Sequence, residues 1–208
     1  MSEKCHASWH TKFIIDISMQ VTYQSFISSL WLILIIYWTL ASLKVKAITR
    51  KEDRLSRAGH VVPLLIAVAM LMLPTLPDGF LCGHILPFDS SMHIIGIALV
   101  ACGVSISIWA RSYLGSNWSG TVTLKQNHEL IRTGPYRYAR RPIYTGLILA
   151  FIGTAIALNE WRGIIAIMII IASFWKKSQR EERWLLEMFG DDYRHYRQKV
   201  KALLPFIL

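Results

Sequence analysis

Long apolar segments restrict this chain to a membrane fold more tightly than any other feature. They lie at about residues 23–43, 61–76, 92–114, 143–158 and 163–175. A helix that crosses a bilayer needs about 20 apolar residues, so the first and third segments are long enough, the second is slightly short and the last two are shorter still. The short sequence "NEWR" joins the last two. They form either a tight hairpin of two spans, which we favour, or a pair that enters the membrane and returns.

The composition agrees with this assignment. The chain has 208 residues, of which 53% are hydrophobic and only 17% are charged, and this balance lies outside the usual range of soluble proteins. Its cysteines, Cys5, Cys82 and Cys102, are odd in number and match no metal-binding spacing. The sequence therefore predicts an all-α integral membrane protein with five transmembrane helices, no disulfide framework and no metal site.

The positive charge of the chain follows the membrane topology. Lysines and arginines crowd the segments 44–57, 125–141 and 176–208, whereas the loop "PDGFLCGHILPFDSS" contains none. Because positive residues mark cytoplasmic loops, we expect an outside N-terminus, with the C-terminus and the functional region in the cytoplasm. The net charge of +10 is then a topology signal and an attraction to anionic membrane lipids, not a sign of nucleic-acid binding. The bacterial inner membrane and the endoplasmic reticulum both fit.

The chain divides into three parts by this reasoning. Residues 1–22 are mixed in polarity and form an N-terminal tail or a short interfacial segment. Residues 23–114 hold three transmembrane helices. Residues 115–208 hold a connecting loop, the transmembrane hairpin and cytoplasmic C-terminal helices. The first apolar run is longer than the 7–15 residues, roughly, of a signal-peptide core, so we expect it to be retained.

The stretch "RTGPYRYARRPIYTG" places arginines at the start of the fourth apolar segment. Gly134 and Pro135 break any helix there, and Pro142 suits the first position of a new one. A helix start gathers unpaired N–H groups and partial positive charge, which favour an anion, and Arg140 and Arg141 add to that field. The alternative is that these arginines only reach the membrane surface.

The last apolar segment continues into a charged region. Leucine, methionine and aromatic residues keep helical spacing up to about Phe189, where Gly190 ends the helix. The following "DDYRHYRQKV" predicts a short amphipathic helix. Lys177 and Glu181 are four residues apart and lie on one helical face. The last two transmembrane helices are thus expected to form a C-terminal hairpin that extends into a cytoplasmic region.

Taken in order, "NWS", "HELI", "GPYRYARRPIYTG", "EERWLLEMFGDDYRHYRQKV" and "LLPF" resemble the isoprenylcysteine carboxyl methyltransferase family, whose wider relatives include phospholipid methyltransferases. The resemblance covers about residues 110–208. It implies S-adenosyl-L-methionine as cofactor, bound at the cytoplasmic side. It also implies methyl transfer to a lipophilic acceptor, for example the carboxylate of a prenylcysteine-like compound.

The resemblance also implies roles for individual residues. Arg140 and Lys177 take catalytic positions, and Lys177 falls where the family handles the carboxylate of the acceptor. The implied cofactor-binding residues are His128, Glu129, Leu130, Ile131, Tyr136, Arg141, Pro142, Ile143, Tyr144, Glu181 and Glu182.

The chain departs from the family pattern at two positions. Arg141 stands where the family usually has histidine, and Lys177 stands where it usually has arginine, so a point charge replaces a bidentate fork. Two alternatives stay open. One is a membrane NADPH-dependent reductase with a related tyrosine-rich tail, although such enzymes have more spans. The other is a non-catalytic scaffold of the same fold.

Overall fold

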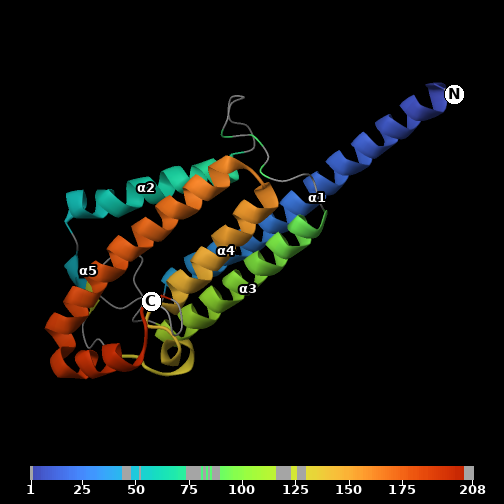
Figure 1. The fold of residues 1–208 in the computed structure, drawn as a ribbon. Helices are drawn as coiled ribbons and strands as arrows, with labels where there is room; N and C mark the ends of the chain where they lie inside the picture. The colour runs from blue at the N-terminus through green and yellow to red at the C-terminus, as the bar shows by residue number, and fades with distance from the viewer. Residues whose placement is uncertain are drawn as a thin grey trace.

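The protein is a bundle of long helices (Figure 1). The computed structural model describes the backbone of residues 2–43, 48–51, 53–73, 81, 83, 85, 90–115, 123–125 and 130–203, and side chains within 21–43, 53–73, 81, 83, 85, 91–115 and 130–203. Its elements are, in chain order, α1 Ser2–Ser42, β1 Ile48–Lys51, α2 Arg54–Met72, α3 Ser90–Leu114, β2 Thr123–Lys125, the 3₁₀ helix η3 Gly134–Arg137, α4 Pro142–Leu158 and α5 Trp161–Lys199.

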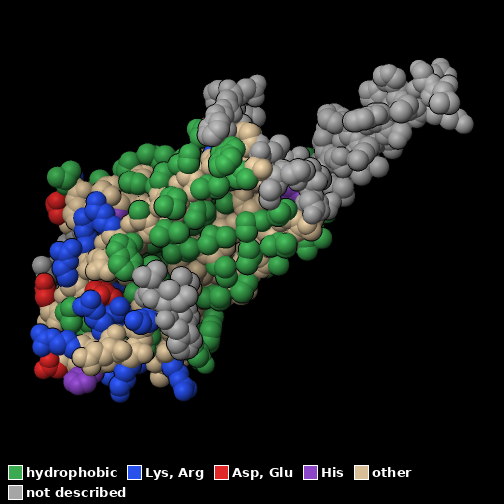
Figure 2. Space-filling model, in the orientation of Figure 1, with side chains coloured by type: hydrophobic (Ala, Val, Ile, Leu, Met, Phe, Trp, Pro, Cys, Tyr) green, Lys and Arg blue, Asp and Glu red, His purple; other side chains and the backbone are tan. Residues whose placement is uncertain are grey.

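Three described stretches of helix are long and apolar enough to cross a membrane, namely Val21–Ser42, Arg54–Met72 and Ser91–Leu114. This confirms the first three predicted segments and an integral membrane protein. The α4 helix, with 17 residues, is shorter, so the count of five spans stays a prediction. Figure 2 shows hydrophobic side chains over the length of the bundle and lysines and arginines gathered at one end, which we call the charged end.

Two helix starts differ from the sequence-based boundaries. The α1 helix begins at Ser2, so residues 2–22 are helical and continuous with the first apolar segment. The α2 helix begins at Arg54, about seven residues before its apolar run, because the Asp53 carboxylate accepts a hydrogen bond from the Leu55 N–H at 3.2 Å. Such a cap satisfies one of the unpaired donors of a first helical turn.

Helices α3 and α4 lie side by side (Figure 1) because glycines remove the side chains between them. A Cβ atom on Gly153 would stand 2.6 Å from the Gly96 carbonyl oxygen, and a Cβ on Gly96 would stand 2.7 Å from that of Gly153. Gly103 and Gly146 meet in the same way nearer the charged end. This close packing is typical of membrane helices, and it fixes the start of α4 relative to α3.

Helix α2 is held mainly by α5 (Figure 1). Near the charged end, Arg180 donates to the Ser56 carbonyl at 2.5 Å and contacts the His60 Nδ1 at 3.1 Å, and Lys176 donates to the Gly59 carbonyl at 3.3 Å. The cations of α5 therefore bind backbone and side-chain acceptors of α2, and the two helices stay together where α5 leaves the apolar region.

Helix α5 changes direction at Gly190, which has φ 51° and ψ −121°. A positive φ of this kind favours glycine, and the break divides α5 into a long helix and a short terminal one, as the sequence predicts. The terminal helix turns back beneath the bundle (Figure 1). Strands β1 and β2 pair antiparallel, and the sequence pattern does not predict them.

Candidate functional site

The start of α4 is held by a segment from much later in the chain. The Arg140 N–H donates to the Lys201 carbonyl at 2.8 Å, and the Arg141 N–H donates to the Ala202 carbonyl at 2.9 Å. One turn further, the Thr145 hydroxyl donates to the Leu203 carbonyl. Residues 201–203 therefore fix the backbone from which the two arginine side chains extend.

The turn before α4 is fixed by aromatic residues. Gly134 has φ 59°, and a Cβ there would lie 2.5 Å from the Cδ1 atom of Tyr113, so both backbone and space require glycine. Tyr136 is buried, and its carbonyl accepts a hydrogen bond from the Tyr196 hydroxyl at 2.5 Å. Its own hydroxyl lies 3.4 Å from the Ala110 carbonyl of α3. The short terminal helix of α5 thereby packs onto the turn.

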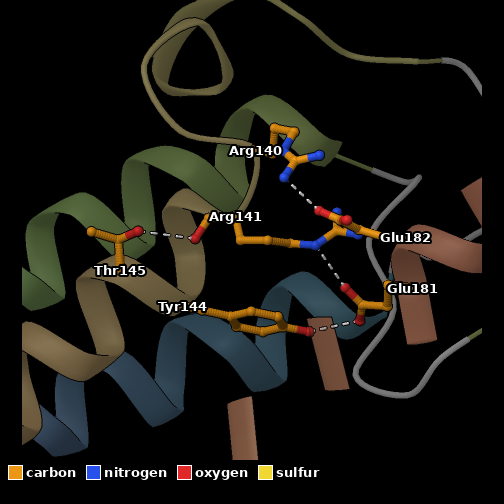
Figure 3. Close-up of polar contacts among 6 residues, drawn as sticks. All are labelled: Arg140, Arg141, Tyr144, Thr145, Glu181 and Glu182. Carbon is orange, nitrogen blue, oxygen red and sulfur yellow. Dashed lines mark hydrogen bonds and ion pairs between the residues drawn. The ribbon is translucent and has the colours of Figure 1, made fainter. Parts of the chain in front are cut away.

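Glu181 of α5 joins two residues from the start of α4 (Figure 3). The Tyr144 hydroxyl donates to its Oε1 at 2.6 Å, and the Arg141 Nε lies 3.2 Å from its Oε2. The side chains of Arg141 and Glu181 are 13% and 19% exposed. This carboxylate is therefore fixed in both position and charge by groups of α4.

Glu182 forms a second ion pair beside the first (Figure 3). Its Oε1 lies 2.8 Å from the Arg140 Nη2, and the two side chains are 3% and 8% exposed. The Arg197 Nε approaches Oε2 from the terminal helix at 3.6 Å. Buried pairs of this type are costly to desolvate and contribute little net stability, so their presence is not explained by stability alone.

Aromatic contacts surround Tyr144. Its ring stacks on Phe174 of α5, with centroids 5.0 Å apart and an interplanar angle of 4°. The Lys177 Nζ lies 5.3 Å from the centroid of the same ring, within the range of cation–π attraction. Lys177 is one turn before Glu181 on α5, so it adds a further cation at the edge of the ion pairs.

The electrostatics keep Arg141, Tyr193 and Tyr196 in one protonation state near neutral pH. Burial on its own lowers the pKa of Arg141, but Glu181 and neighbouring groups outweigh it, and the net shift is upward. Burial raises the pKa of Tyr193, and burial with the nearby Tyr193 raises the pKa of Tyr196 to about 12. The arginine is therefore charged, and the tyrosines keep their hydroxyl protons.

Several buried polar atoms of the site make no hydrogen bond within the part of the chain that the structure describes. They are Nε and Nη1 of Arg140, Nη2 of Arg141, Oγ of Ser178 and the hydroxyl of Tyr193. Buried polar atoms are normally satisfied, and unsatisfied ones at a cluster of charges are typical of a ligand site. Spare guanidinium donors suit a carboxylate or phosphate, and the two glutamates suit a cationic or hydroxyl group.

The comparisons with known proteins agree on one family. Residues 91–192 match the model of the family described as "Phospholipid methyltransferase". Over 151 residues the chain is 30% identical to the protein-S-isoprenylcysteine O-methyltransferase of Saccharomyces cerevisiae, covering 69% of this chain and 63% of that protein. These matches confirm the resemblance to the isoprenylcysteine carboxyl methyltransferase family that the sequence motifs predict.

Other relatives carry the same description. A probable protein-S-isoprenylcysteine O-methyltransferase of Oryza sativa subsp. indica is 28% identical over 146 residues, which are 69% of this chain and 76% of the rice protein. A solved structure of the eukaryotic intramembrane Ras methyltransferase ICMT is 25% identical, with a TM-score of 0.47, and the match covers 74% of this chain and 52% of that one. The chain thus spans less than two thirds of the yeast relative and about half of the solved one.

The structure brings together six of the thirteen residues that the sequence singles out. Arg140, Arg141, Tyr144, Glu181 and Glu182 form one cluster, with Lys177 at its edge. Of the other predicted residues, Tyr136, Pro142 and Ile143 are buried beside the cluster or at the start of α4. Leu130 and Ile131 are half-buried. His128 and Glu129 lie outside the described residues.

Sequence reasoning missed four residues of the site, namely Ser178, Tyr193, Tyr196 and Arg197. Ser178 carries no local signal, because a serine in a polar helix is unremarkable. The two tyrosines did carry a local signal, because "YRHY" after Gly190 places Tyr193 and Tyr196 on one face of a short helix. Both are buried against the site.

Proposed function

We propose that this chain is a membrane-embedded methyltransferase that transfers a methyl group from S-adenosyl-L-methionine to a lipophilic acceptor. The observation that carries the proposal is the pair of buried Arg–Glu contacts at the start of α4, whose arginines keep unsatisfied donors. All four of these residues lie within the stretch that matches the methyltransferase family model. The relatives named above are described as O-methyltransferases.

The residues present fit the cofactor chemically. S-adenosyl-L-methionine supplies a methyl group on a positively charged sulfur, together with a carboxylate, an ammonium group and ribose hydroxyls. The spare donors of Arg140 and Arg141 would bind the carboxylate, aided by the partial positive charge at the start of α4. Glu181 and Glu182 would accept hydrogen bonds from the ammonium group and the hydroxyls.

The chain itself would contribute positioning more than acid–base chemistry. Methyl transfer gains most from alignment of the reacting groups and from exclusion of water. Tyr144 holds Glu181 at 2.6 Å and is covered by Phe174, so the carboxylate and the ring form a fixed, partly apolar wall. A carboxylate acceptor carries no proton to remove, and this agrees with a site that pairs its acids with arginines.

For the acceptor we propose the carboxylate of a prenylcysteine-like compound, because the relatives are described as acting on S-isoprenylcysteine. Lys177, at the edge of the ion pairs and over Tyr144, would attract that carboxylate. A lysine is a point charge that fixes orientation less strictly than the arginine fork of the family, so we expect a broader choice of acid. The comparisons give no support to a reductase or to a non-catalytic scaffold.

We also propose an orientation in the membrane. The charged end (Figure 2), where Arg54, Arg57, Lys176 and Arg183 are exposed, would face the cytoplasm, as the distribution of positive residues favours. The membrane would be the endoplasmic reticulum or the bacterial inner membrane. The cofactor, a soluble cytoplasmic compound, would then reach the site directly.

Calorimetric titration of the purified protein with S-adenosylhomocysteine tests the cofactor. Glu181→Gln removes the charge that holds Arg141 and Tyr144, and we expect binding to weaken at least about tenfold, the effect of losing one charge-assisted hydrogen bond. Glu187→Gln is the matched control, because Glu187 is an exposed acid of the same helix. Wild-type protein that is folded but binds no S-adenosylhomocysteine would refute the proposal.

Transfer of radiolabelled methyl from S-adenosyl-L-methionine to a farnesylcysteine analogue tests the acceptor separately. Label in the analogue with wild-type protein, and its loss in Glu181→Gln, is the expected result. If the protein binds S-adenosylhomocysteine but transfers no methyl group to this analogue, the proposed cofactor stands and the proposed acceptor is wrong.

A further inference from the structure

A polar hollow lies at the opposite end of the bundle from the ion pairs. Helices α1, α2, α3 and α4 converge there around a cavity of about 70 Å³. We call it the His93 hollow; it is lined by Tyr23, Gln24, Ile27, Ser28, Leu71, Met72, His93, Thr154, Ala157 and Leu158. On α4 it begins at Thr154, ten residues after Tyr144, and at the rise of about 1.5 Å per residue this is some 15 Å from the site.

The polar groups of this hollow differ from their neighbours on α1. The Ser25 and Ser29 hydroxyls each donate to the carbonyl four residues earlier, at 2.8 Å. Within the described part of the chain, the Ser28 hydroxyl and the Gln24 amide, which line the hollow, have no hydrogen bond. Polar groups without partners are costly in a membrane helix, so a polar group of another molecule is the natural partner for them.

The other walls are firmly built. The His93 ring is buried and stacks on Tyr23, with centroids 4.9 Å apart and an interplanar angle of 12°. The buried Thr154 hydroxyl accepts from the Trp31 indole at 3.1 Å and donates to the Ala150 carbonyl at 2.9 Å. These contacts fix the walls that His93 and Thr154 form, so a ligand would meet a partly preformed site.

The charge of the hollow restricts the ligand. None of its lining residues is lysine, arginine, aspartate or glutamate. Arg162, at the same end of the bundle, is engaged by the Glu160 carboxylate at 2.5 Å and the Leu73 carbonyl at 2.8 Å. Among the described residues, a phosphate would meet no lysine or arginine there and an ammonium group would meet no acid, so this lining favours a neutral group that donates and accepts hydrogen bonds.

The size and surroundings point to the polar end of a lipid. One water molecule occupies about 10–15 Å³ of such volume, so the hollow accommodates a group of a few heavy atoms. Exposed apolar side chains flank its lining residues along the helices, with Phe26 58%, Ile94 60% and Leu73 49% exposed. A hydrocarbon chain attached to the bound group could lie over them within the bilayer.

We propose that the His93 hollow binds the hydroxyl end of a neutral membrane lipid of the diacylglycerol type, in the leaflet opposite the ion pairs. Gln24 and Ser28 hydrogen-bond the hydroxyl and an ester carbonyl of the lipid, and the acyl chains cover the apolar surface of α1 and α3. This inference does not depend on the proposed methyl transfer.

The test uses the full chain in phosphatidylcholine nanodiscs with a diacylglycerol that carries a diazirine and an alkyne on one acyl chain. After irradiation, we expect labelled peptides from α1 near residues 21–28 or from the start of α3. Excess dioleoylglycerol should lower that labelling at least about fivefold. Dioleoyl phosphatidic acid, which differs by a phosphate on the same hydroxyl, should not.

Paired variants make the test specific. The double variant Gln24→Leu with Ser28→Val should lower the competed labelling by about tenfold, as expected for the loss of one to two hydrogen bonds. Ser25→Val with Ser29→Val is the matched control and should leave it unchanged. All four positions are exposed on α1, and thermal unfolding in detergent verifies that each variant is folded.

Three results would overturn the proposal. The first is labelling spread evenly over all lipid-facing helices and unaffected by the variants. The second is equal competition by phosphatidic acid, which would mean that the hydroxyl is not selected. The third is no competed labelling at all, which would mean that the hollow holds only ordered water.

Discussion

Buried arginine–glutamate pairs occur at both ends of this bundle, and they are built differently. At the turn between α4 and α5, Arg162 donates to both Glu160 oxygens and to the Leu73 carbonyl. At the charged end, Arg140 and Arg141 each pair with one glutamate but keep buried nitrogens without hydrogen bonds among the described residues. The first pair is saturated, as a structural link should be, and the others retain capacity for a ligand.

The largest expected effect is a loss of stability, without a loss of affinity for the cofactor, at the saturated pair of Arg162 and Glu160. Arg162→Met leaves the Glu160 carboxylate and the Leu73 carbonyl without their donor, so we expect the free energy of unfolding to fall by about 3–5 kcal/mol. Denaturant unfolding in detergent measures it. The folded fraction should retain its affinity for S-adenosylhomocysteine, and an unchanged stability would contradict the role of Arg162 as a link.

The converse effect is expected at the charged end. Arg140→Met combined with Glu182→Leu removes both partners, and such replacements are often neutral for stability, so we expect a change in unfolding free energy of less than about 2 kcal/mol. Affinity for S-adenosylhomocysteine should fall about a hundredfold, which corresponds to about 2.8 kcal/mol. Calorimetry and unfolding on the same samples give both numbers. Unchanged affinity would make this pair structural, like that of Arg162.

A third experiment restores the family residue at the other pair. Arg141→His places a group with an ordinary pKa of about 6.5 opposite Glu181. The imidazolium should support binding at low pH, and affinity for S-adenosylhomocysteine should fall several-fold as the pH rises through roughly 6.5–7.5. The wild-type affinity should stay flat, because the pKa of Arg141 is raised. Calorimetric titrations with S-adenosylhomocysteine across this pH range measure the difference. The same pH dependence in both proteins would contradict a role for the charge at position 141 in binding.

The smallest effect concerns the contact that supports the turn before α4. Tyr196→Phe removes the hydrogen bond to the Tyr136 carbonyl, with an expected loss of about 1 kcal/mol. The raised pKa of Tyr196, about 12, means that its contribution is complete below pH ~10 and is lost as the pH rises through its folded value. Tyrosinate absorbance should therefore show one late-titrating tyrosine fewer in the variant. An unaltered alkaline titration would contradict this contact.

The sequence predicts the helices and several of their boundaries well, because local chemistry determines them. Pro142 begins α4, Gly190 breaks α5, and Gly146 and Gly153 face α3, as their residue types favour. The early start of α2 could also have been predicted from the sequence, because an aspartate before a helix is a frequent N-cap. These features depend on neighbours within a few residues.

The pairing within the site could not be predicted in the same way. The sequence offers two adjacent arginines and two adjacent glutamates, and the crossing of α4 and α5 decides which arginine meets which glutamate. Tyr193 enters the site only because the chain turns back after Gly190, whereas Ser178 lies on the long helix of α5 that carries the two glutamates. The His93 hollow is lined by four helices from distant parts of the sequence, so no local sequence pattern predicts it.

The hydrogen bonds from Arg140 and Arg141 to residues 201 and 202 have a consequence for biosynthesis. The carbonyls that receive these two amides are translated after the whole of α4 and α5, and the Tyr196 hydroxyl reaches Tyr136 across 60 residues of sequence. While the nascent polypeptide is still emerging from the ribosome, the start of α4 therefore lacks the carbonyls of residues 201 and 202 and the Tyr196 hydroxyl that fix it. The ion pairs therefore acquire their final arrangement only after the whole of α5 has been synthesised.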